Sequence, residues 1–527
     1  MQHAASDPKQ DLAPGPTPGS IPMAAAFLAD PASHGGAAVQ RVETHAAIVF
    51  LAGDRAYKLK RAVRYPYLDY STVERRRMAC VEELRLNRRT APSLYLGLDS
   101  VVRRSDGSLA FGGEEAKGGT ALDWLVVMRR FPQDALLDRM AERGGLDDAL
   151  IRDLADAVTA FYAAAEPRPD GGGAVAMREV VEGSIAELRA GSSLFPPARV
   201  ERLGELSAEA LDRLAPLLEE RRRGGFVRHC HGDLHLRNIV LLDGKPVLFD
   251  SIEFDERLAV IDVAYDLAFL LMDLERRGLR PLGNAFLNRS LDAAEDYGAL
   301  ALLPLFLSAR AAIRAKIAAS TAALRPDEDA ARRLEREAAA YLEHAVAALE
   351  PPPPRLVAIG GLSGSGKTRL ARALAPSLGA SPGAVVLRSD ALRKRLFGIG
   401  ETERLPAEAY TPAVTERVYA GLLERARTAL AAGHAVVLDA VHARPEERAA
   451  AAALAAEAGV RFDGIWLDAP LDTRIARIAG RRGDASDATA EVAERQTVYD
   501  LGPLEWLRTN AGRDAGETLA AVLERLV

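Results

Sequence analysis

Gly361-Leu362-Ser363-Gly364-Ser365-Gly366-Lys367-Thr368 follows an apolar run over 356–359 and precedes a stretch of helical pattern over 368–378. Glycines at these positions let backbone N–H groups turn inward around phosphate oxygens. We expect Lys367 to reach the β- and γ-phosphates of ATP and the Thr368 hydroxyl to bind Mg²⁺. An accidental match is improbable, on the order of one in a hundred for such a chain. All eight residues are therefore predicted to form a nucleotide-binding loop.

The region around this loop alternates between strand and helix patterns. Short apolar runs at 356–359, 385–387, 435–438 and 464–467 are separated by helical stretches. This alternation is typical of a parallel α/β sheet, in which ligands bind beyond the carboxyl ends of the strands.

Polar residues follow two of these strands. Asp390 and Arg393 come after the second strand, where Asp390 could accept a proton from an attacking hydroxyl and Arg393 could hold the acceptor. Asp439 ends the next strand and suits a role in binding Mg²⁺ through water. The alternative is that both aspartates cap helices and that Arg393 is a solvated side chain.

Arginines gather on a later helix and in the loop after it, and they resemble a lid that closes on phosphates. We predict a catalytic role for Arg481, whereas in a chain this rich in arginine any of these residues could equally be a plain surface residue. The cluster consists of Arg474, Arg477, Arg481 and Arg482. With these features, residues 355–527 resemble the small P-loop kinases that phosphorylate metabolites, antibiotics or nucleic-acid ends. In such families the aspartate after the second strand is the usual candidate base.

A second motif lies in the first part of the chain, His231-Gly232-Asp233-Leu234-His235-Leu236-Arg237-Asn238. It has the form of a kinase catalytic loop, in which Asp233 would accept the hydroxyl proton and Asn238 would bind Mg²⁺. Asp250 follows the strand 246–249 and is placed like the second metal-binding aspartate. The continuation 251–254, Ser-Ile-Glu-Phe, departs from the Asp-Phe-Gly of protein kinases. Asp266 could brace the catalytic loop from a helix.

The segment before this motif predicts the nucleotide-binding lobe. Runs at 48–51 and 56–60 flank Gly53-Asp54 as in a hairpin, and a helix is expected over 71–90 with Ser71 as its cap and Glu74 completing a capping box. Lys58 and Lys60 point to the same strand face. We favour Lys58 as the lysine that binds the α- and β-phosphates and Glu83 as its partner, with Lys60 and Glu82 as open alternatives. No Gly-x-Gly-x-x-Gly loop precedes the hairpin.

Residues 40–345 strongly resemble the aminoglycoside phosphotransferase family, whose hallmark is the His-Gly-Asp-Leu-His-x-x-Asn stretch with a downstream aspartate. The whole chain resembles bacterial bifunctional proteins that join such a domain to an ATP-binding domain. The resemblance implies a bilobal protein-kinase-like α+β domain followed by a P-loop NTPase domain with a parallel α/β sheet. Two alternatives remain for the first part: a degenerate kinase that binds without turnover, and a metal cluster of His229, Cys230, His231 and His235.

The chain of 527 residues is too long for one core. We expect a disordered tail over 1–22, a kinase-like domain over 23–349, a proline linker over 350–354 and a P-loop domain over 355–527. Only eight of the 68 basic residues are lysines, so a lysine in this chain can mark a place where an arginine fork cannot serve.

The net charge of −6 argues against a nucleic-acid-binding protein. The two distant cysteines favour a reducing cytoplasm, and no apolar run approaches a membrane span. The sequence thus predicts a cytoplasmic, ATP- and Mg²⁺-dependent phosphotransferase with two ATP-binding domains that acts on a small hydroxylated acceptor. The alternatives are an ATP-binding regulatory module and an ATPase with a degenerate kinase-like half. The acceptor and the oligomeric state stay open.

Overall fold

The computed structural model describes residues 20–44, 46–65, 68–191, 194–324, 327–480 and 485–526. By packing, the chain divides into two compact units. Unit 1 comprises Met1–Leu146, Ala160–Ala176 and Glu219–Asp266, and unit 2 comprises Asp147–Thr159, Met177–Leu218 and Leu267–Val527. This division groups many helices of the predicted domain 23–349 with the parallel sheet, and the predicted domain ranges, which follow the chain, stay predictions.

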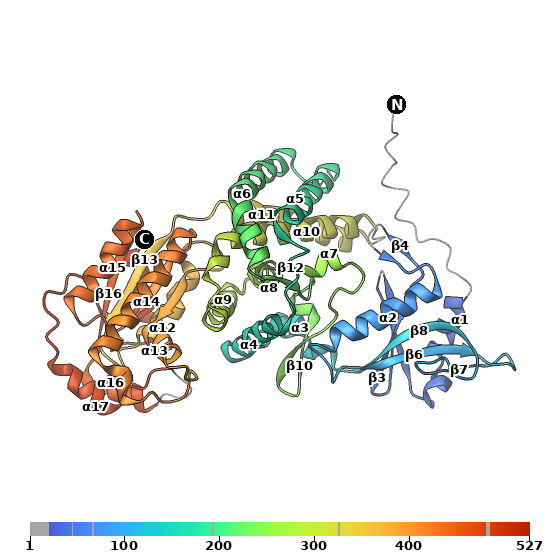
Figure 1. The fold of residues 1–527 in the computed structure, drawn as a ribbon, viewed down its shortest axis with the longest axis horizontal. Coiled ribbons are helices and arrows are strands. Elements are labelled where there is room, and N and C mark those ends of the chain that lie inside the picture. Colours follow the sequence, from blue (N-terminus) through green and yellow to red (C-terminus); the bar gives the residue numbers. More distant parts are fainter. Residues whose placement is uncertain are drawn as a thin grey trace. The chain divides into compact units, whose positions relative to one another are not determined.

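Unit 1 is built on an antiparallel sheet with the strand order β1-β2-β3-β8-β6-β7 (Figure 1). The expected hairpin is confirmed, because β2 and β3 pair around Gly53-Asp54. The bounds are β1 Val39–Glu43, β2 Ala47–Ala52, β3 Arg55–Lys60, β6 Tyr95–Arg103, β7 Leu109–Phe111 and β8 Thr120–Arg129.

Helices cover both faces of this sheet. Helix α2 (Val73–Asn87) packs on the face that carries Lys58 and Lys60, and α1 (Ser20–Ala29) packs on the other. Because α1 buries Ile21, Ala24 and Leu28, residues 20–22 are helical and not part of a tail; residues 1–19 lie outside the described ranges.

The predicted cap of α2 is wrong by one residue. Thr72 Oγ1 accepts a hydrogen bond from the Arg75 N–H (3.2 Å), so Thr72 is the cap. The Ser71 hydroxyl instead donates to Asp69 (2.6 Å) and cannot serve the helix. The predicted capping box of Ser71 and Glu74 is therefore not formed.

Short elements complete unit 1 and hold the second motif. β10 and β11 pair as a hairpin around the turn Asp243-Gly244. The remaining elements are η1 Pro31–His34, β4 Arg64–Tyr65, β5 Leu68–Asp69, η2 Gln133–Ala135, α3 Leu137–Glu142, β9 Val227–His229, η3 Leu236–Asn238, β10 Ile239–Leu242, β11 Lys245–Leu248, α7 Glu256–Ala259 and β12 Val260–Asp262.

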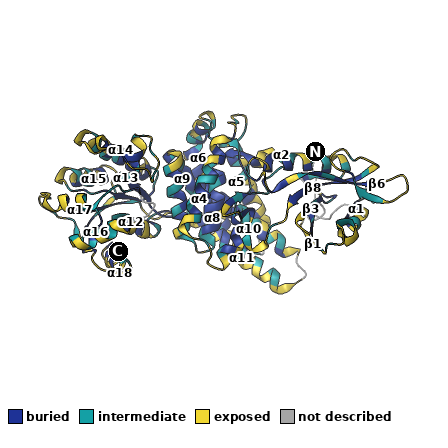
Figure 2. Cartoon of the chain, turned by 90° about the horizontal axis from the view of Figure 1, so that it is seen from below, coloured by how far each residue is buried: buried dark blue, intermediate teal, exposed yellow. Residues whose placement is uncertain are grey.

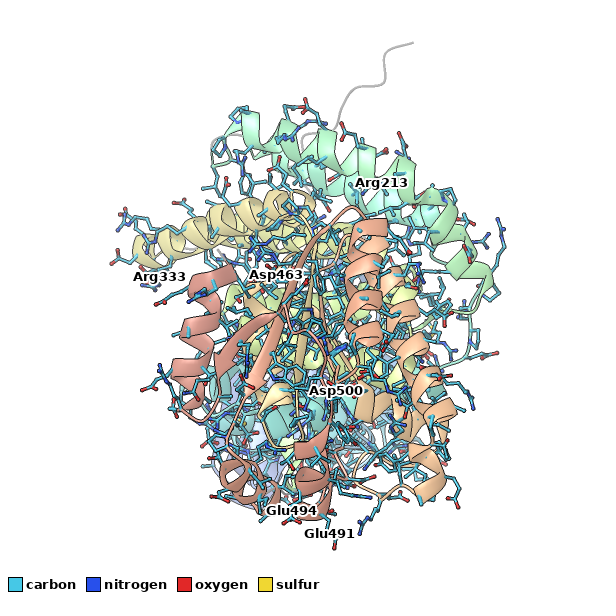
Figure 3. All side chains as sticks on the ribbon, turned by 90° about the vertical axis from the view of Figure 1, so that its left-hand side faces the viewer. Arg213, Arg333, Asp463, Glu491, Glu494 and Asp500 are labelled. Atoms are coloured by element: carbon cyan, nitrogen blue, oxygen red, sulfur yellow. The ribbon has the colours of Figure 1, made fainter. Side chains whose placement is uncertain are left out.

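The stretches that remain between residues 148 and 349 are mostly helical. They form α4 Asp148–Ala164, α5 Gly173–Ala190, α6 Pro197–Arg223, α8 Val263–Arg276, α9 Arg280–Ala294, η4 Tyr297–Leu302, α10 Leu303–Ala323 and α11 Glu328–Leu349. Charged residues such as Arg213 on α6 and Arg333 on α11 point outward (Figure 3). Buried residues gather on the inner faces of these helices (Figure 2).

One stretch of these helices, Tyr297–Ala323, is long and apolar enough to cross a membrane by length and composition. The expectation that no apolar run approaches a membrane span is wrong for this stretch. Within the described residues 67% of its most apolar window is buried, and α10 packs along α11. This is the pattern of a core helix.

Unit 2 also contains a parallel sheet with the order β14-β15-β13-β16-β17, which confirms the parallel α/β prediction. Helices α12 and α18 pack on one face, and α14 and α15 contact the strands as well. The strands are β13 Arg355–Gly361, β14 Val385–Arg388, β15 Val436–Asp439, β16 Arg461–Asp468 and β17 Leu507–Asn510. The other elements are α12 Lys367–Leu374, η5 Ala375–Ser377, α13 Ser389–Leu396, η6 Ala407–Tyr410, α14 Pro412–Ala431, α15 Pro445–Glu457, α16 Leu471–Ala479, α17 Ala490–Arg495, η7 Gln496–Val498 and α18 Ala515–Leu526.

Within unit 2, helix α9 lies against the outer edge of β14. The side-chain amides of Asn284 and Asn288 donate to Ala384 O (3.0 and 3.2 Å), and Asn288 Oδ1 accepts from the Val386 N–H (2.7 Å). Two asparagine side chains thus take the hydrogen-bonding positions of a neighbouring strand.

Candidate active sites

The phosphate-binding loop joins β13 to α12 in a backbone shape that requires its glycines. Gly364 has φ +84° and Gly366 has φ +99°, both in the left-handed region. A Cβ at Gly364 would lie 2.5 Å from Arg474 O, and one at Gly361 would lie 2.7 Å from Ser365 Oγ. The sequence pattern therefore follows from steric limits on this loop.

The ends of two parallel strands bring the predicted metal-binding groups together beside the loop. β13 and β15 pair with Ile359 opposite Asp439. Thr368 Oγ1 donates to Asp439 Oδ2 (2.6 Å). Burial raises the pKa of Asp439 above its ordinary value, against the lowering effect of Arg388 and Lys367. A hydroxyl and a carboxylate at a helix N-terminus are the donor set that a Mg²⁺-nucleotide needs, so these residues fit the metal.

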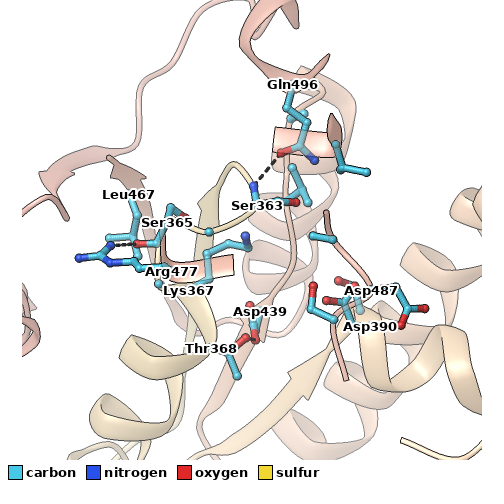
Figure 4. A pocket seen from close by; sticks show the side chains of 18 of the residues that line it. Ser363, Ser365, Lys367, Thr368, Asp390, Asp439, Leu467, Arg477, Asp487 and Gln496 are labelled. Carbon is cyan, nitrogen blue, oxygen red and sulfur yellow. Dashed lines mark hydrogen bonds between the residues drawn. The ribbon is translucent and has the colours of Figure 1, made fainter. Parts of the chain in front are cut away.

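A cavity of about 1650 Å³ opens from this loop and reaches the residues after β14. Lys367, Thr368, Asp390, Arg393 and Asp439 all line it. In Figure 4, Lys367 lies on the loop side of Asp439, and Asp390 lies on the opposite side. The cavity exceeds the usual volume of a pocket for one small ligand, so it has room for a nucleotide and a second molecule.

Arg393 is largely immobilised within this cavity. The residue is 7% exposed, and its guanidinium donates to Ala409 O (2.6 Å) and to Thr415 Oγ1 (3.3 Å) and lies over the Tyr410 ring. We call the set Gly361–Thr368, Asp390, Arg393 and Asp439 the P-loop site.

The second site lies in unit 1, where strand β3 faces α2. Lys58 Nζ donates to Glu83 Oε1 (2.8 Å) and to Asp250 Oδ1 (2.6 Å). Burial alone would lower the pKa of Lys58, but the carboxylates of Asp250 and Glu83 outweigh it and raise the pKa above its usual range. Burial likewise opposes the ionisation of Glu83, but Lys58 and Lys60 bring its pKa down to about 2.

The motif 231–238 forms a loop that is tied at both ends. Asn238 Nδ2 donates to Asp233 Oδ2 (2.9 Å), and His235 Nε2 lies 3.3 Å from the same oxygen. The buried Asp266 accepts from the N–H groups of His231 and Gly232 (3.0 and 2.9 Å), which confirms its bracing role. We call the set Lys58, Glu83, Asp233, Asn238 and Asp250 the kinase-like site.

Comparisons with known proteins match both parts of the chain. The phosphotransferase enzyme family matches residues 110–303, and the AAA domain family matches residues 356–499. The uncharacterized protein Rv2004c of Mycobacterium tuberculosis is 34% identical over 474 residues, which cover 87% of this chain and 90% of that protein. The chain belongs to the same family as Rv2004c. The uncharacterized protein Mb2027c of Mycobacterium bovis gives the same identity and coverage.

Among solved structures, the chain is similar to the Mycobacterium tuberculosis APS kinase CysC in complex with AMPPNP and APS. The identity is 26%, and the match covers 33% of this chain and 98% of that one, with a TM-score of 0.25. A gluconokinase from Sinorhizobium meliloti matches at 21% identity over 33% of this chain and 93% of that one, with a TM-score of 0.24.

As a member of this family, the chain carries a phosphotransferase domain followed by a P-loop domain, and it is an enzyme of the kinase type, a class that uses ATP. The predicted resemblance to the two kinase families and the predicted fold class are thus confirmed. The phosphotransferase match contains Asp233, Asn238 and Asp250, but it begins after Lys58 and Glu83.

Between the alternatives left open in the kinase-like site, the geometry separates one pair of residues. Glu82 is half-buried and pairs with Arg85, whereas Glu83 is fully buried and pairs with both lysines. Lys58 reaches Asp250, and Lys60 lies further inside. In the alternative metal cluster, Cys230 Sγ and His231 Nε2 each contact a backbone carbonyl, of Ile261 and Phe249. In the described ranges, no three or more His, Cys, Asp or Glu side chains gather into a group that could hold a metal ion.

The arginine cluster divides into described and undescribed members. Arg474 is buried and donates to Ser363 O (3.4 Å) and Ala493 O (3.3 Å), so it supports the loop backbone. Arg477 lines the cavity and donates to Ser365 O (3.3 Å). Arg481 and Arg482 lie outside the described residues, and the role predicted for Arg481 stays a prediction.

Two cavity residues had escaped the sequence analysis. Gln496 Oε1 accepts from the Ser363 N–H (2.7 Å), and Asp487 accepts from the Leu405 N–H and the Tyr410 hydroxyl (2.9 Å each). Asp487 lies in the irregular stretch before α17 and Gln496 in the short 3-10 helix η7 after it, and neither periodicity nor a motif marks these positions.

Proposed function

We propose that the P-loop site transfers the γ-phosphoryl group of ATP to a hydroxyl of a small acceptor. The observation that carries this proposal is the single cavity that joins Lys367 and the Thr368–Asp439 pair to Asp390. An ATPase that uses only water needs no such extension beyond the phosphate loop.

In this proposal, the loop amides and Lys367 hold the β- and γ-phosphates, and Thr368 and Asp439 hold Mg²⁺, which neutralises phosphate charge when bound. Asp390 accepts the proton of the acceptor hydroxyl while the hydroxyl oxygen bonds to the γ-phosphorus. The bond between the γ-phosphorus and the oxygen that bridges it to the β-phosphate breaks, and ADP leaves. Arg393 orients the acceptor. The products are ADP, the phosphorylated acceptor and one proton.

We further propose that the kinase-like site binds a second ATP. The observation that favours this is the joining of Lys58 to both Glu83 and Asp250, beside an Asp233–Asn238 pair with catalytic-loop geometry. Asp233 would be the base there, and Asn238 and Asp250 would hold Mg²⁺. The rival function is a regulatory nucleotide-binding module without transfer.

A cytoplasmic location and a small-molecule partner complete the proposal. Both cysteines, Cys80 and Cys230, are free and buried, which suits a reducing compartment. The net charge of −6 supports a small acceptor over a nucleic acid.

The test is ADP release by the full chain at saturating ATP against a panel of sugars, amino alcohols, nucleosides and antibiotics. We expect one class of acceptor to raise the rate, and we expect Asp390→Asn to remove about 10²–10⁴-fold of that rate while ATP still binds. Asp472→Asn is the matched control, because Asp472 also lies in the first turn of a helix but does not line the cavity.

Each remaining outcome identifies a rival. ADP release that no acceptor changes, and that Asp390→Asn leaves unaltered, indicates an ATPase or a sensor. Acceptor-dependent release that Lys367→Ala leaves intact and Asp233→Asn abolishes assigns the transfer to the kinase-like site.

A further inference from the structure

A second buried lysine lies directly behind Lys58. The Lys60 side chain is 2% exposed, and its Nζ pairs with Glu83 Oε2 (2.5 Å) and with Glu253 Oε1. The Tyr70 hydroxyl also donates to Glu253 Oε1 (2.6 Å). Family likeness to kinases accounts for one lysine on this strand, so Lys60 and Glu253 need their own explanation.

The ion pairs form a closed circuit. Glu83 shares its two carboxylate oxygens between Lys58 and Lys60, which lie on the same face of β3. Lys58 continues to Asp250, and Lys60 continues to Glu253. Since Asp250 and Glu253 are three residues apart in one segment, that segment is held at both ends by the same strand.

Further hydrogen bonds fix the residues in between. The Asp250 N–H donates to the Tyr95 hydroxyl (3.1 Å), the Ser251 N–H to Asn87 Oδ1 (2.9 Å), and the Ile252 N–H to His231 O (3.0 Å). Asp250 itself has φ +62°, a left-handed conformation that a non-glycine residue keeps only when its surroundings enforce it.

This arrangement occupies the place of the Asp-Phe-Gly segment, whose phenylalanine packing sets active and inactive states in protein kinases. Here a buried carboxylate, Glu253, takes the position three residues after the aspartate and pairs with a fixed lysine. Loss of a charged partner in the interior is strongly disfavoured, and an outward swing of this segment would break the Lys58–Asp250 and Lys60–Glu253 pairs together, leaving both lysines to share the carboxylate of Glu83.

We propose that Lys60 and Glu253 are positioning residues that hold Asp250 in place for the metal-nucleotide, so that the kinase-like site is assembled before ATP arrives. The inference rests on the proposed use of ATP by this site. Neither residue touches the reacting atoms; Lys60 acts through Glu83, and Glu253 acts through the segment 250–253.

The experiment uses the full chain with Lys367→Ala, which removes phosphate binding by the P-loop site. ATP affinity is measured with Mg²⁺ and with EDTA, and the ratio of the two affinities reports how well Asp250 is placed to bind the metal. Amide hydrogen exchange of the peptide containing 250–254 is measured without nucleotide. The variants are Lys60→Met, Glu253→Gln and the two combined. The double variant removes one positive and one negative charge, so it leaves the net charge unchanged and serves if a single variant fails to fold.

Asp123→Asn is the matched control. Asp123 forms an ion pair with Arg76, which lies on helix α2 like Glu83. Both side chains of this pair are fully buried, and Asp123 takes no part in the circuit. It reports what the loss of a buried ion pair does to stability alone.

We expect Lys60→Met and Glu253→Gln to reduce the gain in affinity from Mg²⁺ about tenfold and to speed exchange at 250–254 by a similar factor. Asp123→Asn should lower the melting temperature and change neither. If the Lys60 and Glu253 variants keep the gain in ATP affinity from Mg²⁺, and hydrogen exchange at 250–254 stays slow, the two residues are structural only and the inference is wrong. If the parent protein binds no ATP, the proposed nucleotide use fails, and hydrogen exchange alone still decides whether the segment is clamped.

Discussion

The P-loop site takes its phosphate-binding groups from eight consecutive residues, whereas the kinase-like site takes its groups from segments that extend from Lys58 to Asp250. Glycine backbone geometry fixes the first, and a circuit of ion pairs centred on the buried Glu83 fixes the second. Backbone geometry is local and resists changes in charge. Ion pairs across distant segments depend on each partner, so the two sites should respond differently to substitution.

The largest effect is expected from removal of the predicted base in the kinase-like site. Asp233→Asn in the Lys367→Ala background should lower phosphoryl transfer by about 10²–10⁴-fold and leave Mg²⁺-ATP binding near normal, because the lost group acts on the acceptor hydroxyl. Single-turnover transfer to an acceptor that this background uses gives the measurement. Asp243→Asn, at the exposed hairpin turn, should behave like the parent protein, and an equal loss in both variants would remove the special role of Asp233.

Dependence on ion pairs also predicts a pH effect. The pKa of Glu83 is about 2 in the folded chain, below its usual 4.5, so the stability from its ionisation is present above pH 4.5 and is lost as the pH falls toward 2. Glu83→Gln should therefore lower the free energy of unfolding by up to about 3 kcal/mol at pH 6 and by less at pH 3. Urea unfolding at both pH values is the check, and a difference that does not shrink would contradict the assigned pKa.

The P-loop site should instead be sensitive to backbone change. Gly364→Ala should weaken ATP binding by roughly 1–3 kcal/mol, because its Cβ would meet Arg474 O in a left-handed conformation. Gly433→Ala is the matched control, since Gly433 has φ +82° and open space around it. Isothermal titration in the Asp250→Asn background isolates the P-loop site, and equal affinities of both variants would mean that the steric limit is unimportant.

The smallest effect separates two neighbouring glutamates. Glu82 is half-buried at the surface and pairs with the exposed Arg85, so Glu82→Gln should change stability by less than about 1 kcal/mol and leave ATP binding intact. Melting temperature and ATP affinity, measured beside Glu83→Gln, give the comparison. A large loss from Glu82→Gln would reverse the assignment of the partner of Lys58.

This contrast also explains what the sequence could predict. The P-loop, its flanking strand and helix, and the parallel sheet follow from local pattern. The hairpin around Gly53-Asp54 could be predicted in the same way. The choice between Glu82 and Glu83 could not, because both positions fit a helix that packs beside the strand of Lys58. The two glutamates differ only in which side chain points into the interior, and that depends on tertiary packing.

Residues whose position depends on tertiary contacts were missed or misplaced. Gln496 and Asp487 lie in segments without periodicity, and the cap of α2 moved to Thr72 because Asp69 engages Ser71. The rarity of lysine was a useful signal: Lys58, Lys60 and Lys367 all lie at the two sites. Arginine could not reproduce the single point charge that Lys60 places between two carboxylates.

The asparagines of α9 have a practical meaning for anyone who divides this chain. β14 is the outer strand of the parallel sheet, and bare strand edges promote self-association of protein molecules. Asn284 and Asn288 shield the edge at Ala384 and Val386. A fragment that starts at Arg355, after the proline linker, would lose this shield and should tend to aggregate, so a soluble P-loop fragment has to retain α9.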